Sequence, residues 1–209
     1  MSAARTALYL IAIAVAVYLW SWISFYDSNE ESDVSHFVSA VRAPLMARLG
    51  TVDLAVEQGY KQMTVMGRDG TAIYFDRTFE GIDPLHPNFL WFNKHNRLVG
   101  VDYEVPTTAF PEPPGQELFP VKQSRWKIVP AHVHVAYTEA GVLNFKEGEM
   151  QPNLLGDNVS TDTLVADGLL ASGARLIWFS FHPRSWDLGL WLIHNPLGAT
   201  AGYNPWVYF

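Results

Sequence analysis

The chain has 209 residues, of which 49% are hydrophobic and 14% aromatic, so it can bury a substantial core within one domain. Its formal net charge is −7 at pH 7, which disfavours nucleic acid as a partner. The sequence contains no cysteine, and this excludes disulfides, thiolate nucleophiles and cysteine-ligated metal sites.

An uncharged, mostly apolar run occupies residues 6–26 near the N-terminus. As a helix it would span about 31 Å at ~1.5 Å per residue, enough to cross a hydrocarbon core about 30 Å thick. The run is longer than the core of a signal peptide, and no Ala-x-Ala-like cleavage site precedes Asp27. We therefore expect residues 1–26 to form an uncleaved transmembrane anchor. Arg5 precedes the run and acidic residues follow it, which predicts a cytoplasmic N-terminus.

The remaining chain is then an exported, periplasmic domain of a bacterial inner-membrane protein. A domain outside the cytoplasm without disulfides suits the bacterial envelope. Ala12 and Ala16 stand at small-xxx-small spacing and offer a face for packing against other membrane helices. Trp20 and Trp22 would lie at the headgroup level of the lipid bilayer.

A polar, acidic linker at residues 27–34 leads into the exported domain at 35–209. Helical spacing of apolar residues runs up to Gly50 and involves Phe37, Val38, Val41, Leu45 and Leu49. Pro44 inside this helix predicts a kink or a break. Thr51 can cap a second short helix.

From Lys61 onward the apolar period changes toward two, which predicts β-strands. The expected strands are 63–66 with 72–75, 89–92 with 98–105, 126–137 with 142–145, and then 175–181 and 188–193. Residues 106–120 hold five prolines and predict a surface loop, and residues 153–162 a polar loop. The expected fold class is mainly β, an antiparallel sandwich or barrel-like sheet after a small helical head.

The most chemical pattern is the strand that carries His132 and His134. Residues i and i+2 of a strand face the same side, so both imidazoles can reach one zinc or other divalent ion. Glu139, beyond the following turn, can add an oxygen ligand, and His182 and His194 at strand ends are candidates for a third imidazole. The pattern resembles the first metal motif of the cupins, although the other elements of that family are absent. A polar strand face without metal is the alternative.

No organised nucleophile accompanies these histidines. The sequence has neither a Gly-x-Ser-x-Gly elbow nor a glycine-rich phosphate loop. We therefore do not expect an enzyme.

The C-terminal region contains the segment Trp186-Asp-Leu-Gly-Leu-Trp-Leu-Ile-His-Asn-Pro-Leu-Gly198, followed by Asn204-Pro205. It resembles the closing segment of a family of uncharacterised bacterial exported proteins, and similar stretches extend the resemblance over residues 50–209. In that family a histidine usually stands at the position of Gly189. If the relatives bind a metal through the histidine strand and that tail histidine, the resemblance implies that this chain has lost a ligand and holds zinc weakly.

The chain ends in Trp206, Tyr208 and Phe209, and such residues are enriched at protein interfaces and membrane surfaces. We expect an accessory or structural subunit of an integral-membrane complex, for example a respiratory or photosynthetic reaction-centre assembly. Its partners would be integral-membrane subunits and the lipid bilayer. The alternative is a membrane-tethered metal-binding or redox domain that uses the strand of His132 and His134.

Overall fold

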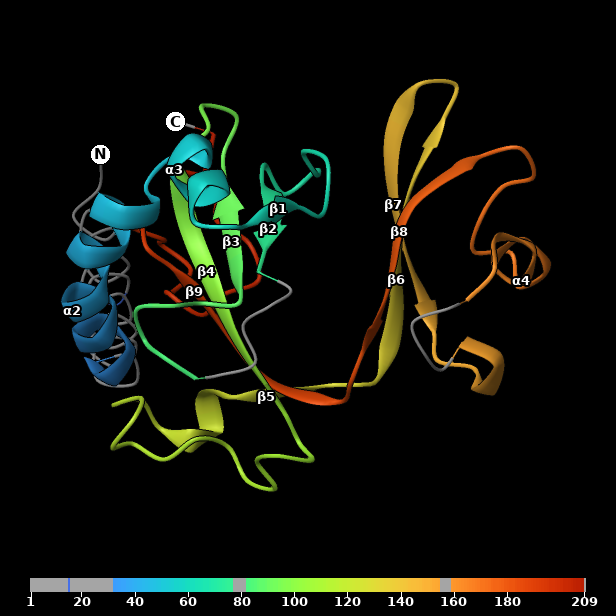
Figure 1. The fold of residues 1–209 in the computed structure, drawn as a ribbon. Coiled ribbons are helices and arrows are strands. Elements are labelled where there is room, and N and C mark those ends of the chain that lie inside the picture. Colours follow the sequence, from blue (N-terminus) through green and yellow to red (C-terminus); the bar gives the residue numbers. More distant parts are fainter. Residues whose placement is uncertain (1–14, 16–31, 77–81, 155–158, 209) are drawn as a thin grey trace, which may run out of the picture.

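The structure is a computed structural model that describes residues 15, 32–76, 82–154 and 159–208 (Figure 1). The predicted anchor, with Ala12, Ala16, Trp20 and Trp22, lies outside these residues, and so does Phe209. In the described part of the chain, no helix is both long and apolar enough to cross a membrane.

Two antiparallel sheets lie next to each other in the domain (Figure 1). The larger has the order β1 (Lys61–Gln62), β2 (Ala72–Phe75), β3 (Phe89–Phe92), β4 (Leu98–Pro106), β9 (Ser185–Trp191) and β5 (Lys127–Val129). The smaller has the order β7 (Val142–Glu149), β6 (His132–Glu139) and β8 (Arg175–His182). The prediction of a mainly β, antiparallel domain is confirmed.

Two segments of the chain pass from one sheet to the other. Only Pro130 and Ala131 separate β5 from β6, and only Pro183 and Arg184 separate β8 from β9. The sequence predicted a single strand over 126–137, but the structure divides it between the sheets. Proline explains the division, because it has no N–H to continue a ladder and it restricts the residue before it.

The turns that the sequence predicted between strands are largely present. The turn at 93–96 joins β3 to β4 as expected. The turn between β6 and β7 consists of Ala140 and Gly141 with φ angles of 50° and 81°, the positive values of a tight two-residue hairpin. Residues 63–66 do not form a strand; instead β1 pairs with β2, and Met63 N donates to Ile73 O at 2.8 Å.

The helical elements follow the sequence only in part. The helix α2 (Ser32–Leu49) begins inside the predicted linker and continues through Pro44, so the predicted break does not occur. Buried residues on both sides of Pro44 hold the helix to the core: Val34, Phe37, Val41, Leu45 and Leu49. The helix α3 (Val52–Glu57) is capped by Thr51 as expected. The helix α4 (Thr161–Ala166) and the 3₁₀ turn at Pro152–Leu154 overlap the predicted polar loop, and a second 3₁₀ turn spans Gln123–Arg125.

The larger sheet has an apolar face and a mixed face, on which carboxylates stand beside Trp91 and Trp191. Along β4, Val101, Tyr103 and Val105 are buried in the core that α2 covers, whereas Asp102 and Glu104 lie on the other face. The loop after β4 also enters this core, since Phe119 is fully buried and its ring centroid lies 4.8 Å from that of Tyr103. The carboxylates are thus left on the face that carries no helix.

The smaller sheet alternates in the same way. Val133 and Val135 of β6 are buried in a second apolar cluster with Leu164 of α4. His132 and His134 therefore point to the opposite face. The fold brings two polar sheet faces into the same region of the molecule.

Candidate metal centre

The centre of the polar region is β6, on which the histidines share one face as predicted. Its neighbours in the ladder add further ligand types. Glu147 of β7 is the register partner of His134, and Glu149 is the partner of His132. On the other side, His182 of β8 is the partner of His132. Directly opposed residues on one sheet face lie within side-chain contact.

Three of these side chains form a group that could hold a metal ion. Ligand atoms of His132, His134 and Glu147 all lie within 4.8 Å of one another. Ligand atoms around a tetrahedral zinc ion stand roughly 3.3 Å apart, because each lies ~2.0–2.1 Å from the ion. Small side-chain rotations would close this group around one ion.

The ring of His132 is oriented for this role. Its Nδ1 lies 2.8 Å from the carbonyl oxygen of Pro130, and since a carbonyl can only accept, Nδ1 carries the proton. The lone pair of His132 is therefore on Nε2, which accepts a hydrogen bond from Nε2 of His134. A metal ion bound between the two nitrogens would replace the proton that His134 Nε2 donates. A backbone carbonyl that fixes the tautomer of a ligand histidine is a common outer partner at metal sites.

His134 is the most enclosed member, with 6% of its surface exposed. Burial, followed by the nearby charges of His132 and His182, lowers the pKa of His134 to about 3. His134 is consequently neutral at physiological pH, which is the form that binds metals.

A third imidazole lies beside the pair and links the two sheets. The ring centroid of His182 is 4.4 Å from that of His132 and 5.4 Å from that of His134. Its Nε2 hydrogen-bonds the carboxylate of Glu104 from β4. Burial acts to lower the pKa of His182, but the hydrogen bond and charge of Glu104 outweigh it and the pKa is raised.

Two more carboxyl groups extend the cluster away from the histidines. Asp187 is the register partner of Glu104, and Asp102 accepts a 2.7 Å hydrogen bond from the indole of Trp91. Burial, then the charges of neighbouring carboxylates, raises both pKa values, that of Asp187 to about 7. The cluster is thus less negative at neutral pH than its residue count suggests.

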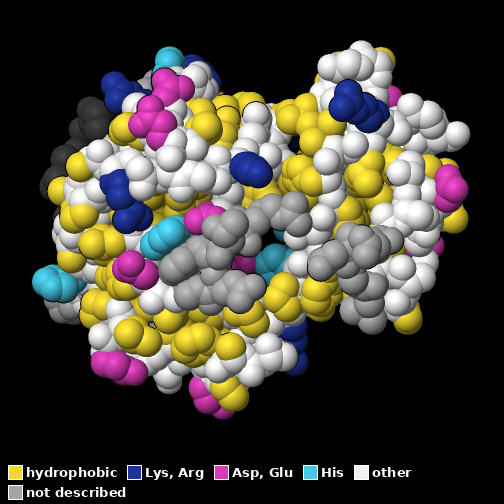
Figure 2. Space-filling model, in the orientation of Figure 1, with side chains coloured by type: hydrophobic (Ala, Val, Ile, Leu, Met, Phe, Trp, Pro, Cys, Tyr) yellow, Lys and Arg dark blue, Asp and Glu magenta, His cyan; other side chains and the backbone are white. Residues whose placement is uncertain are grey.

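A groove of about 800 Å³ opens onto this cluster. Its walls combine apolar side chains of the larger sheet, including Ile73 and Phe89, with His132, His134 and Glu147 of the smaller one. Figure 2 shows histidine and acidic side chains in the narrow middle of the molecule, between the parts built on the two sheets. The volume falls within the range of small-molecule sites.

Two sequence-predicted ligands lie elsewhere. Glu139 is at the far end of β6, where it pairs with Val142 beside the turn, about 16 Å from His134 at ~3.3 Å per residue. His194 follows β9 and its ring lies 4.8 Å from that of Trp206. Among the described residues, neither belongs to the metal-binding group, and Glu147 takes the place expected for Glu139.

Sequence reasoning missed Glu147, although a signal for it exists. A two-residue turn at Ala140 and Gly141 fixes the hairpin register and sets His134 opposite Glu147. Glu104 had no such signal, because it reaches His182 across 78 positions of sequence.

Gly189 lies in the larger sheet. It is the register partner of Asp102, and a Cβ added there would stand 2.6 Å from Asp102 Oδ1 and 3.2 Å from the Trp91 ring. The third imidazole near the pair comes from His182 instead. The loss of a ligand at position 189 stays a prediction.

The C-terminal aromatic residues lie apart from this centre. Trp206 is 51% exposed and Tyr208 37% exposed, while Val207 between them is fully buried. The hydroxyl of Tyr208 donates to the backbone oxygen of Arg68. The chain end is thus anchored and presents aromatic surface.

Comparisons with protein-family models, curated proteins and solved structures find no match to this chain. The resemblance of the C-terminal segment to a bacterial exported family therefore stays a prediction.

Proposed function

We propose that this domain binds a divalent transition-metal ion, zinc foremost, through His132, His134 and Glu147. The observation that carries the proposal is the convergence of two imidazole nitrogens and a carboxylate within 4.8 Å on one sheet face. Two imidazoles and a carboxylate are a ligand set that zinc accepts. With the predicted anchor, the protein is a membrane-tethered metal-binding domain.

The surroundings of the group support an accessible ion. Three protein ligands leave one tetrahedral position, and the groove offers that position to water or a small molecule. His182 and Glu104 lie beside the group as a hydrogen-bonded pair that can exchange a proton with such a molecule. The proposal does not extend to a particular reaction.

The test is zinc titration of the full chain in detergent, by competition with a chromogenic chelator. We expect one bound equivalent of zinc. His134→Ala should weaken zinc binding roughly a hundredfold, because the binding free energy of a structural zinc site, about 10–16 kcal/mol, is divided among four ligands and the variant loses one of them. His194→Ala is the matched control and should bind as the unaltered protein does. Absence of zinc binding, or equal losses in the two variants, would contradict the proposal.

We also propose a second function, that of an accessory subunit of an integral-membrane complex. It is favoured by a set of exposed apolar residues close to the chain end: Leu197, Tyr203, Trp206 and Tyr208. Exposed aromatic residues that are held in place by a buried neighbour make effective interface anchors. The two functions are compatible, since these residues lie outside the histidine cluster.

Native gel mobility after mild solubilisation tests the second function. Trp206→Ala should shift the protein from a complex toward the free chain while its melting temperature stays within about 2 °C. Phe181→Ala removes an aromatic ring of similar exposure from the smaller sheet and should leave the complex intact. A protein that migrates as a lone chain in all three forms would exclude this function.

A further inference from the structure

The two sheets are joined by one bent β-ribbon. Val129 pairs with Ser185 in the larger sheet, and His132 pairs with His182 in the smaller one. The same number of residues separates these pairs on each strand, so the ribbon keeps its register through the bend. Figure 1 shows the two sheets rising from this bend as two arms. We call the described residues of 32–129 and 184–208 the larger arm, and those of 132–182 the smaller arm.

Few bonds fix the angle of the bend. It consists of Pro130, Ala131, Pro183 and Arg184, and none of these described residues forms a ladder pair. The two prolines have no N–H to donate. On one side the bend is tied to the larger arm, because Thr107 N donates to Arg184 O at 2.9 Å. A change of angle therefore moves the smaller arm against the larger one.

The candidate metal centre lies directly on the bend. Nδ1 of His132 donates to Pro130 O at 2.8 Å, so a carbonyl group of the bend sets the orientation of a ligand ring. On the other strand, His182 is the last residue of β8 before the bend. Its ring stacks on that of His132, with 4.4 Å between centroids and an interplanar angle of 25°. The ring of His132 is thus held from both strands, and a change in the bend moves its Nε2.

A second path of contacts connects the other ligand ring to the larger arm. The ring of His134 meets that of Phe145 edge-on, with 5.3 Å between centroids. Phe145 packs against Trp178 at 6.1 Å, and Trp178 packs against Phe75 of the larger arm at 5.2 Å. The positions of both ligand rings therefore depend on the larger arm, although all three ligands belong to the smaller one.

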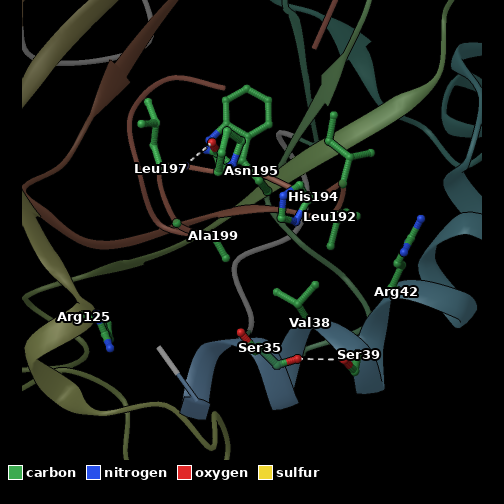
Figure 3. A pocket seen from close by; sticks show the side chains of 14 residues that line it. Ser35, Val38, Ser39, Arg42, Arg125, Leu192, His194, Asn195, Leu197 and Ala199 are labelled. Atoms are coloured by element: carbon green, nitrogen blue, oxygen red, sulfur yellow. Dashed lines mark hydrogen bonds between the residues drawn. The ribbon is translucent and has the colours of Figure 1, made fainter. Parts of the chain in front are cut away.

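Two cavities differ in how they depend on the angle. A cleft of about 540 Å³ lies between α2 and residues 191–199, and its described lining comes entirely from the larger arm (Figure 3). The groove of about 800 Å³ is lined by both arms, with Phe89 on one side and His134 and Glu147 on the other. A change of angle opens or closes the groove and leaves the cleft as it is.

We propose that the bend is a metal-responsive hinge: an ion bound by His132, His134 and Glu147 fixes the angle between the arms, and its release frees that angle. The inference rests on the proposed metal binding. Zinc draws the ligand atoms, which lie within 4.8 Å of one another, to roughly 3.3 Å, and this fixes the ring of His132 against the carbonyl of Pro130. By linkage, a molecule that fills the groove and holds the arms at the same angle raises the affinity for the metal.

The test measures the distance between the arms in the full chain in detergent, with zinc as the only added ligand. The chain has no cysteine, so two introduced cysteines carry all of the nitroxide label. Lys94→Cys and Val142→Cys place the labels at exposed turns, each at the end of its arm that is distant from the bend. Pulsed electron paramagnetic resonance should give a broad distance distribution without zinc and a narrower one with one equivalent.

A control pair and a zinc titration separate the possible outcomes. The pair His36→Cys and Lys94→Cys lies within the larger arm, so zinc should leave its distribution unchanged. If the labelled protein binds one equivalent of zinc and the distribution between the arms keeps its width, the hinge is overturned and the metal site stands. If no zinc binds, both proposals are overturned.

A substitution in the larger arm tests the coupling from the other side. Phe75→Ala removes the ring that packs on Trp178 and alters none of the three ligands. We expect the zinc affinity to fall roughly fivefold, at the lower end of typical coupling energies, and the distribution of the zinc-loaded protein to broaden. Phe37→Ala is the matched control, since it removes another buried Phe of the larger arm. Unchanged zinc affinity in Phe75→Ala, or an equal loss in Phe37→Ala, would overturn the coupling. If Phe75→Ala does not fold, the label distances in the otherwise unaltered chain still decide.

Discussion

The two faces of the larger sheet differ sharply although the same strands build them. Toward α2, β4 presents Tyr103 and Val105, each about 1% exposed. Toward the smaller sheet the same strand presents Asp102 and Glu104. The first face is stabilised by burying apolar surface, and the second holds carboxylates in place with partners from other strands. A substitution on the first face should therefore change the stability of the domain and leave its chemistry intact, and a substitution on the second face should do the reverse.

The polar face depends on the smaller sheet. Without His182 the carboxylate of Glu104 would lose its hydrogen-bond partner in a half-buried position. The histidine cluster and the carboxylate cluster are therefore one network that joins the two sheets, whereas the apolar face packs against α2, α3 and the loops next to the larger sheet.

The largest effect is expected on the apolar face. Phe37→Ala removes a ring that is 2% exposed and packs on Phe119 at 5.4 Å between ring centroids. Truncation of a buried Phe costs about 3–5 kcal/mol, measurable by urea unfolding. The exposed neighbour His36 is the control, and His36→Ala should change stability by less than about 0.5 kcal/mol. Zinc affinity of folded Phe37→Ala should be unchanged; a large loss would show that the two faces are not separable.

A smaller effect is expected where the two sheets meet. Glu104→Gln keeps a hydrogen-bond acceptor for His182 but removes the charge that raises its pKa. The pKa of His182, followed by NMR, should fall below that of the unaltered protein. A histidine with a raised pKa stabilises the folded state fully below pH 6.5 and loses this contribution as the pH rises through its folded pKa. The stability difference between the two proteins should therefore be largest at acidic pH, and a difference that grows with pH would contradict the assignment.

The last effect is expected on the slope of stability with pH and comes from Asp187, whose pKa burial raises from 3.8 to about 7. The folded state favours the protonated carboxyl, so stability falls as the pH rises between these values, by at most about 1.4 kcal/mol per pH unit. Asp187→Asn should remove this contribution to the slope. His134 has a lowered pKa, which changes stability with pH in the opposite direction. Its contribution is the same in both proteins, so it cancels when the free energy of unfolding of one is subtracted from that of the other at each pH. Parallel slopes in the two proteins would contradict a raised pKa.

Local patterns in the sequence predicted the parts of the fold that local chemistry decides. The strand alternation around His132 and His134 and the turns at 93–96 and 139–141 follow from side-chain period and turn residues. Pro44 misled the prediction of a helix break, because buried neighbours on α2 outweigh one missing hydrogen bond.

The remainder depends on contacts that no local pattern contains. Residues 126–137 are divided between the two sheets at Pro130. The proline alone does not predict that the chain passes to a second sheet there. The pairing of β4 with β9 and the contact of Glu104 with His182 join segments about 80 positions apart. Long-range strand pairing of this kind is set by the whole fold.

The central claim is that His132 and His134 hold one metal ion together with Glu147. X-ray absorption spectroscopy of the zinc-loaded full chain tests it most directly. We predict a first shell of nitrogen and oxygen at about 2.0–2.1 Å, with the multiple-scattering signature of two imidazoles. That signature should vanish in the His132→Ala, His134→Ala double variant. A shell of oxygen neighbours alone, or an imidazole signature that survives in the double variant, would contradict the claim.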